Sequence, residues 1–187
     1  MAEVLLFHHA QGLTAGVLEF AAELRGSGHT IHTPDLYEGK TFRDLDGGVA
    51  YMKQLGELVD SRAQASASGL PRTLIYAGMS MGVGPAQMLA QTRPGAKGAL
   101  LMYGALPASE FGPWPPGVPL QVHAMADDPW FKDDADAARE LVAEAKGELF
   151  LYPGDKHLFA DNSLPDFVEE EAQLLKQRVL EFLDSIR

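Results

Sequence analysis

The chain of 187 residues contains no cysteine. It can therefore form no disulfide bond, no thiolate metal site and no cysteine nucleophile. Its first residues, MAEVLLFHHAQG, include an acidic residue and no basic residue before a short apolar run, which is unlike a secretory signal peptide. Because a cytoplasmic protein needs no disulfides, we expect this protein to be cytoplasmic.

Basic residues and long apolar runs are also scarce. There are 15 Lys and Arg residues against 26 Asp and Glu, which gives a formal net charge of -11. A surface this acidic repels phosphate groups, so we expect neither nucleic acid nor a membrane as a partner. No apolar run approaches the roughly 20 residues that cross a bilayer. Apolar residues still make up 46% of the chain, enough to build the core of a single domain over residues 1–187.

Short apolar runs alternate with amphipathic stretches along the whole chain. Nearly continuous apolar character is typical of strands that helices cover on both faces. We expect such strands at residues 4–8, 29–33, 73–77, 99–103, 120–125 and 149–152. Alternation of strands and helices predicts an α/β fold with a mostly parallel sheet of about six or seven strands.

The helical spacing is clearest in two stretches. Residues 44–63 place apolar side chains at intervals of three and four, so we expect one helix there, capped by Asp44. A last helix is expected to start near Ser163 and Pro165 and to dock on the sheet. Residues 61–71 are predicted to be a helix end and a surface loop. Residues 106–119 are rich in proline, which predicts an extended connection without room for a lid domain.

Ser80 is the candidate nucleophile. It lies in the segment GMSMG, between an apolar strand pattern and a helical pattern. This is the context of a nucleophile elbow, a turn so tight that the positions two before and two after the serine must lack bulk. The serine then projects from the carboxyl edge of the sheet, and the backbone N–H of Met81 can enter an oxyanion hole.

A serine nucleophile needs a histidine as general base and an acid that orients the histidine. Asp127 and Asp128 follow the strand at 120–125, and His157 lies in a loop after the last strand. In α/β hydrolases the three residues follow in the order serine, acid, histidine, which is the order found here. Either aspartate alone is equally well explained as a solvated turn or as the cap of the acidic helix that follows.

Four segments carry a resemblance to a known family: HTPDLYEGKTF, AGMSMGVGPA, HAMADDPWF and YPGDKHLFAD. In their order and spacing they resemble the dienelactone hydrolase family, a compact branch of the α/β hydrolases without a cap domain. The resemblance implies that Ser80 is the nucleophile, His157 the base and Asp128, the aspartate directly before proline, the acid. It also implies that the loop around Ala10 and Gln11 supplies a second oxyanion N–H.

The sequence departs from the family's namesake enzymes in three respects. Those enzymes use cysteine in the elbow where this chain has Ser80, and they carry a glutamate after the first strand where this chain has His9. Their substrate-binding arginines have no match beside His157. We therefore expect hydrolysis of small to medium esters or lactones, rather than of dienelactone in particular, and no cofactor or metal. The roles of His8 and His9 stay open, and nothing in the sequence specifies an oligomeric state.

Several residues near the predicted site are candidates for binding the substrate: His9, Met79, Trp130 and Phe159. The main alternative to an enzyme is a non-catalytic member of the same fold that binds a small ligand in the same cleft. Nucleotide binding at Gly39 and Lys40 is not expected, because a phosphate loop needs glycine at the position of Pro34. The histidines show no metal-ligand spacing.

Overall fold

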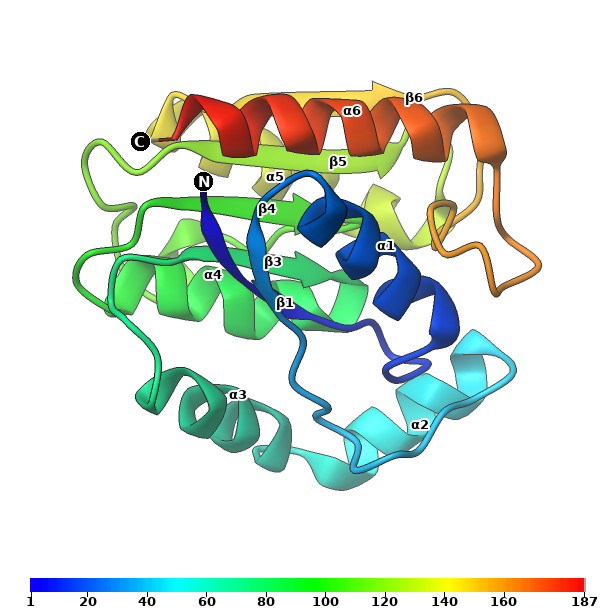
Figure 1. The fold of residues 1–187 in the computed structure, drawn as a ribbon. Coiled ribbons are helices and arrows are strands. Elements are labelled where there is room, and N and C mark those ends of the chain that lie inside the picture. The colour runs from blue at the N-terminus through cyan, green and yellow to red at the C-terminus, as the bar shows by residue number, and fades with distance from the viewer. Residues whose placement is uncertain (187) are drawn as a thin grey trace.

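Six parallel strands form one sheet in the computed structural model, which describes residues 1–186 (Figure 1). The strand order across the sheet is β2-β1-β3-β4-β5-β6. Each strand lies within two residues of a predicted apolar run, so the predicted fold class is confirmed. The strands are β1 (Glu3–Phe7), β2 (Thr30–His32), β3 (Ile75–Met79), β4 (Gly98–Met102), β5 (Leu120–Met125) and β6 (Glu148–Tyr152).

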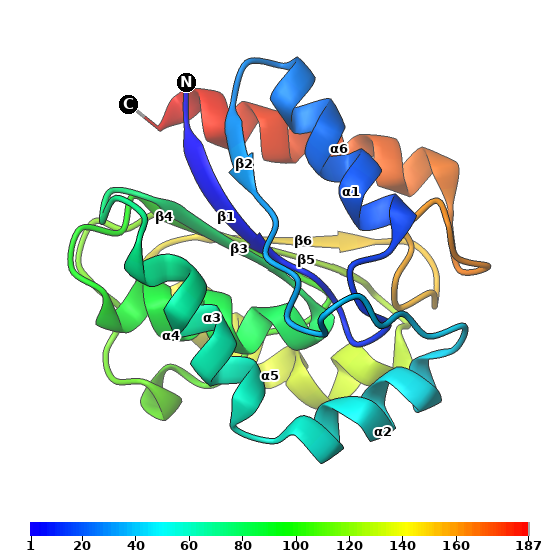
Figure 2. The same ribbon diagram turned by 60° about the horizontal axis from the view of Figure 1, so that its bottom comes forward.

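Helices cover both faces of the sheet (Figure 2). Helices α1 (Ala15–Gly26) and α6 (Glu169–Ser185) pack on one face, and α3 (Leu58–Ser68), α4 (Val83–Thr92) and α5 (Pro129–Ala145) pack on the other. Successive side chains of a strand point to opposite faces. Val4 and Leu6 therefore join the core under α1 and α6, whereas Leu5 and Phe7 join the core under α3, α4 and α5.

The segment predicted as one helix over residues 44–63 is two helices, α2 (Leu45–Leu55) and α3. The break is at Gly56, whose φ of 54° lies in the left-handed region that glycine adopts at little cost. Helix α3 continues to Ser68, so the predicted helix end takes up most of residues 61–71 and the surface loop only the last few. The predicted cap is confirmed, because the Asp44 carboxylate accepts a hydrogen bond from the Gly47 N–H at 2.7 Å.

The last helix begins later than predicted, at Glu169 rather than near Ser163 and Pro165. The Ser163 hydroxyl donates to the Asp161 carboxylate instead of capping this helix. The proline-rich connection contains only the short 3-10 helix η2 (Ala108–Glu110), and no cap domain stands over the sheet within residues 1–186. No helix in this described part of the chain has both the length and the apolar character needed to span a membrane.

Candidate active site

Ser80 lies in the turn between β3 and α4, at the start of the short 3-10 helix η1 (Ser80–Gly82). Its φ of 50° is left-handed, which is strained for a residue with a side chain. The turn is tight because two glycines allow it: a Cβ at Gly78 would lie 2.1 Å from the Gly82 carbonyl oxygen, and a Cβ at Gly82 would lie 2.5 Å from the Phe7 carbonyl oxygen. The Gly-x-Ser-x-Gly spacing thus reflects backbone contacts on both sides of the serine.

The structure brings Ser80, His157 and Asp128 into one hydrogen-bonded line. Ser80 Oγ lies 2.8 Å from His157 Nε2, and His157 Nδ1 lies 2.6 Å from Asp128 Oδ2. An ionised carboxylate only accepts hydrogen bonds, so the imidazole proton is on Nδ1 and Nε2 is free to accept the serine proton. This is the geometry in which a serine hydroxyl can be deprotonated as it attacks.

Burial distinguishes the two neighbouring aspartates. Asp128 is fully buried and uses both carboxylate oxygens, since Oδ1 accepts a hydrogen bond from the Trp130 N–H at 2.9 Å while Oδ2 faces His157. Asp127 is exposed, and within residues 1–186 its hydrogen bond is that of its backbone N–H to the Gly154 carbonyl. Asp128 therefore caps α5 and also orients His157. The helix cap and the acid, which the sequence offered as alternatives, are both roles of this one residue.

Two aromatic side chains flank the imidazole of His157. The ring centroids of Tyr103 and Trp130 each lie 5.8 Å from the imidazole centroid. Tyr103 follows β4 with a φ of 76° and is buried, whereas Trp130 is 46% exposed. Trp130 could be predicted from the sequence because it lies two residues after Asp128. Tyr103 could not, because no local pattern relates the end of β4 to His157.

A cavity of about 300 Å³ opens in front of Ser80 and reaches Trp130, one of the predicted substrate-binding residues. Its wall is mostly apolar, with two carboxylates from α5. The lining residues are Ser80, Met81, Val83, Gly84, Tyr103, Gly104, Ala105, Leu106, Trp130, Asp133, Asp134 and His157.

The other three predicted binding residues do not line this cavity. Met79 and Phe159 are 1% and 0% exposed, and both belong to the core under α1 and α6. Met79 points to that face because the strand alternates, and Phe159 packs against the rings of Tyr103 and Tyr152. His9 is fully buried, and its Nε2 is bonded to Asp161. All three are interior residues.

Asp133 and Asp134 give the cavity an acidic wall that sequence reasoning missed. Their positions near the start of α5 suggested only a solvated, acidic first turn. Burial raises the pKa of the Asp134 carboxyl above its ordinary value, although a hydrogen bond from the backbone of Ala105 and the nearby His157 act in the opposite direction. The helix start is thus turned toward the cavity.

The loop after β1 contains the two amides predicted for the second oxyanion contact. The Gln11 N–H is engaged, since it donates to His9 Nδ1 at 3.2 Å. No residue within 1–186 accepts a hydrogen bond from the Ala10 N–H. Met81 is the second residue of η1, in the first turn, where N–H groups have no partner inside the helix. The Ala10 and Met81 amides are therefore the donors that this geometry leaves for an oxyanion.

Helix α2 packs directly against this loop. A Cβ at Gly48 would lie 2.2 Å from the Ala10 carbonyl oxygen, so only glycine permits the contact. His8, which precedes the loop, is neutral: its Nδ1 donates to the His9 carbonyl at 2.8 Å and its Nε2 accepts the Leu36 N–H at 3.0 Å. Burial lowers the pKa of His8 to about 4. His8 therefore connects the end of β1 to the loop that follows β2.

A second cavity, of about 370 Å³, lies next to His157 and Trp130. Its lining includes Gln11 from the loop after β1, two cations and three carboxylates: Arg43, Lys156, Asp44, Asp155 and Asp166. His157 and Trp130 line both cavities, so a bound molecule could extend from one to the other past the serine.

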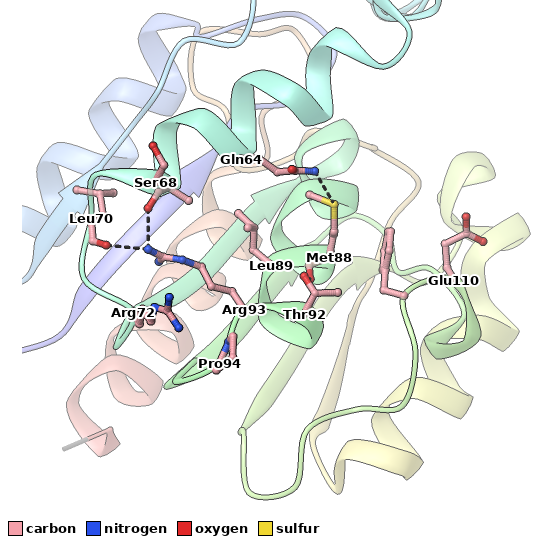
Figure 3. A pocket seen from close by; sticks show the side chains of 12 residues that line it. Gln64, Ser68, Leu70, Arg72, Met88, Leu89, Thr92, Arg93, Pro94 and Glu110 are labelled. Atoms are coloured by element: carbon pink, nitrogen blue, oxygen red, sulfur yellow. Dashed lines mark hydrogen bonds between the residues drawn. The ribbon is translucent and has the colours of Figure 1, made fainter.

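A larger cavity, of about 790 Å³, lies between α3 and α4 and shares no residue with either of these (Figure 3). Arg93 at the end of α4 donates to the carbonyls of Ala67, Leu70 and Pro71 and to the Tyr76 hydroxyl. Four N–H groups of its guanidinium thus connect the end of α4 to the end of α3, to the segment that follows α3 and to β3. No group of three or more His, Asp or Glu side chains in the described residues is arranged to hold a metal ion.

A parallel sheet with a strained serine directly after β3, at its carboxyl edge, defines the class of α/β hydrolases. Within that class, the chain belongs to the dienelactone hydrolase family, whose model matches residues 1–187. Family membership identifies it as a hydrolase. Among curated proteins, none matches the chain significantly.

Solved structures with the same fold have low sequence identity to this chain. A dienelactone hydrolase-like promiscuous phosphotriesterase from metagenomic libraries is 17% identical, with a TM-score of 0.78 over 100% of this chain and 87% of its own. A candidate dienelactone hydrolase from Klebsiella pneumoniae subsp. pneumoniae is 20% identical, with a TM-score of 0.73 over 99% of this chain and 87% of its own. The RedJ thioesterase of Streptomyces coelicolor is 15% identical, with a TM-score of 0.59 over 96% and 85%.

Proposed function

We propose that this protein is a serine hydrolase that cleaves small to medium carboxylic esters or lactones through an acyl-enzyme on Ser80. The observation that carries the proposal is the hydrogen-bonded line from Ser80 Oγ through His157 to the buried Asp128. A non-catalytic ligand-binding protein would have no use for a serine held at a left-handed φ beside an imidazole with a free Nε2.

In the first half of the reaction, Ser80 Oγ attacks the carbonyl carbon while His157 Nε2 takes its proton. The imidazolium that forms is stabilised by Asp128. The N–H groups of Met81 and Ala10 donate to the oxyanion, and one such donor is worth about 3 kcal/mol in the transition state. His157 then returns the proton to the leaving oxygen as the carbon–oxygen bond breaks, which leaves the acyl group on Ser80.

In the second half, a water molecule attacks the acyl carbon and gives its proton to His157 Nε2. The carbon–oxygen bond to Ser80 breaks, the serine takes the proton back, and the carboxylic acid leaves. These steps require no cofactor. The proposed binding partner of the protein is its substrate, a small-molecule ester or lactone.

The cavity in front of Ser80 favours a particular charge on the substrate. Its volume of about 300 Å³ fits a small or medium acyl group, and its apolar wall includes Met81, Leu106 and Trp130. Asp133 and Asp134 in the same wall repel a carboxylate. Both carboxylates are at least partly exposed, so at a separation of about 6 Å one such repulsion lies between the ~3 kcal/mol of a protein-like dielectric constant and the ~0.7 kcal/mol of water, at about 1–1.5 kcal/mol. Uncharged acyl groups are the expected substrates.

The test is hydrolysis of p-nitrophenyl acetate by the wild type, combined with labelling by a fluorophosphonate and mapping of the labelled residue. We expect turnover and a label on Ser80 alone. A wild-type protein that neither hydrolyses a panel of esters of varied acyl length nor takes up the label would support the ligand-binding alternative.

A further inference from the structure

A second histidine–aspartate pair lies buried beside the site. His9 Nε2 and Asp161 Oδ2 are 2.8 Å apart, and both side chains are almost completely shielded from solvent. The pair takes no part in the steps proposed above. Because the pair is buried, each of its polar atoms needs a hydrogen-bond partner. One of these partners is a backbone N–H of the loop after β1.

The hydrogen bonds of His9 determine its protonation. The Asp161 carboxylate only accepts, so His9 Nε2 carries the proton and donates it to Asp161. His9 Nδ1 is then a lone-pair acceptor, and it receives the Gln11 N–H at 3.2 Å. A neutral imidazole thus forms one rigid connection from a buried carboxylate to the backbone of the loop after β1.

Asp161 is itself held by several groups. Thr14 and Ser163 donate side-chain hydrogen bonds to its carboxylate, and the Ser163 N–H adds another at 2.9 Å. Burial alone would raise the pKa of this carboxyl, but the hydrogen bonds from His9, Ser163 and Thr14 outweigh it, and the pKa is lowered. The start of α1 leaves space for the carboxylate, because a Cβ at Gly16 would lie 1.8 Å from Asp161 Oδ1.

We infer that His9 and Asp161 are positioning residues that hold the loop after β1 so that the Ala10 N–H points at the oxyanion of the reaction. The inference rests on the proposed function, and it assigns the two amides of the loop different tasks. The Gln11 N–H anchors the loop to His9, and the neighbouring Ala10 N–H, which donates to no acceptor within residues 1–186, stays available for the oxyanion. Neither His9 nor Asp161 touches the reacting atoms.

Two variants separate the two bonds of His9. In His9→Asn the side-chain oxygen can take the place of Nδ1 and accept the Gln11 N–H, but the side chain is too short to reach Asp161. In His9→Gln the amide can take the place of Nε2 and donate to Asp161, but no acceptor remains at the Nδ1 position. The two variants are otherwise matched in polarity and charge.

We expect kcat for p-nitrophenyl acetate to fall about 10- to 100-fold in His9→Gln and less than about 5-fold in His9→Asn, with KM within about 3-fold in both. The upper limit is the effect of losing one oxyanion donor, which is on the order of 10²–10³ in kcat. The affinity for a trifluoromethyl ketone, whose adduct carries the oxyanion, should fall in parallel with kcat. The thermal unfolding midpoint identifies any variant that is merely less stable.

Wild-type kcat and ketone affinity in His9→Gln would overturn the inference, and so would equal losses in the two variants. Amide hydrogen exchange keeps the test independent of catalysis. Exchange of the Gln11 N–H should be faster in His9→Gln than in His9→Asn, whether or not the protein hydrolyses esters. A wild type without esterase activity would refute the proposed function, whereas slow Gln11 exchange in His9→Gln would refute the positioning role.

Discussion

The substitution Asp128→Asn tests the proposed mechanism most directly. Asp128 is fully buried and accepts two hydrogen bonds, one from His157 Nδ1 at 2.6 Å and one from the Trp130 N–H at 2.9 Å. Asparagine has a single side-chain oxygen for these two donors. The Trp130 amide cannot give up its proton, whereas the imidazole can change its tautomer. The favoured arrangement therefore keeps the helix cap and turns the NH₂ group toward His157.

An NH₂ group facing His157 moves the imidazole proton to Nε2, where it prevents the histidine from accepting the Ser80 proton. We expect kcat to fall about 10⁴-fold, which corresponds to about 5 kcal/mol in the activation free energy. The thermal midpoint should change little, because the cap of α5 is retained. In Asp128→Ala the cap is lost as well, and stability should fall by a further ~1 kcal/mol.

The neighbouring residue provides the matched control. Asp127 is exposed and its carboxylate has no hydrogen bond within residues 1–186, so Asp127→Asn should keep kcat within about 2-fold. The assay is steady-state hydrolysis of p-nitrophenyl acetate, with circular dichroism of each variant. The reasoning fails if Asp127→Asn is slower than Asp128→Asn, or if Asp128→Asn retains wild-type kcat.

Three further outcomes are expected. Ser80→Ala should lower kcat for p-nitrophenyl acetate on the order of a million-fold in a fully active enzyme, and wild-type rates in this variant would refute the nucleophile. Asp134→Asn should raise kcat/KM for p-nitrophenyl hemiadipate relative to p-nitrophenyl hexanoate about 10-fold, because a repelling charge leaves the cavity wall; an unchanged ratio would contradict the acidic wall. Burial lowers the pKa of His123 from 6.5 to about 3, with a smaller effect of Arg178. The unfolded chain therefore takes up this proton first, and stability present above pH 6.5 is lost as pH falls, by about 2 kcal/mol at pH 5. Urea unfolding of His123→Gln at pH 7 and pH 5 should show a pH effect smaller by that amount, and an equal effect would exclude His123 as its source.

The elbow could be found from the sequence because its constraint is local. Gly78 and Gly82 lack side chains for reasons that lie within the turn and the strand beside it, so the pattern is visible in five consecutive residues. The strands were predictable for a similar reason, since burial on both faces makes each an apolar run. The break at Gly56 was missed because an apolar face continued across it.

The substrate-binding residues were harder to predict. Proximity along the chain favoured Met79 and Phe159, but both point into the core under α1 and α6. Asp133 and Asp134 looked like a solvated helix start, although α5 turns them toward Ser80. Whether each of these side chains lines the cavity depends on which face of the sheet or helix is turned toward it. A single sequence does not specify that orientation.

Local order along the chain thus specified the class of fold, the serine turn and the succession of serine, acid and histidine. Tertiary packing decided which of Asp127 and Asp128 faces His157, and which of the Ala10 and Gln11 amides stays available. Both choices depend on contacts between segments far apart in the chain, from Asp128 to His157 and from His9 to Asp161. Such hydrogen bonds form only when the sheet has brought the segments together, so no local pattern can contain them.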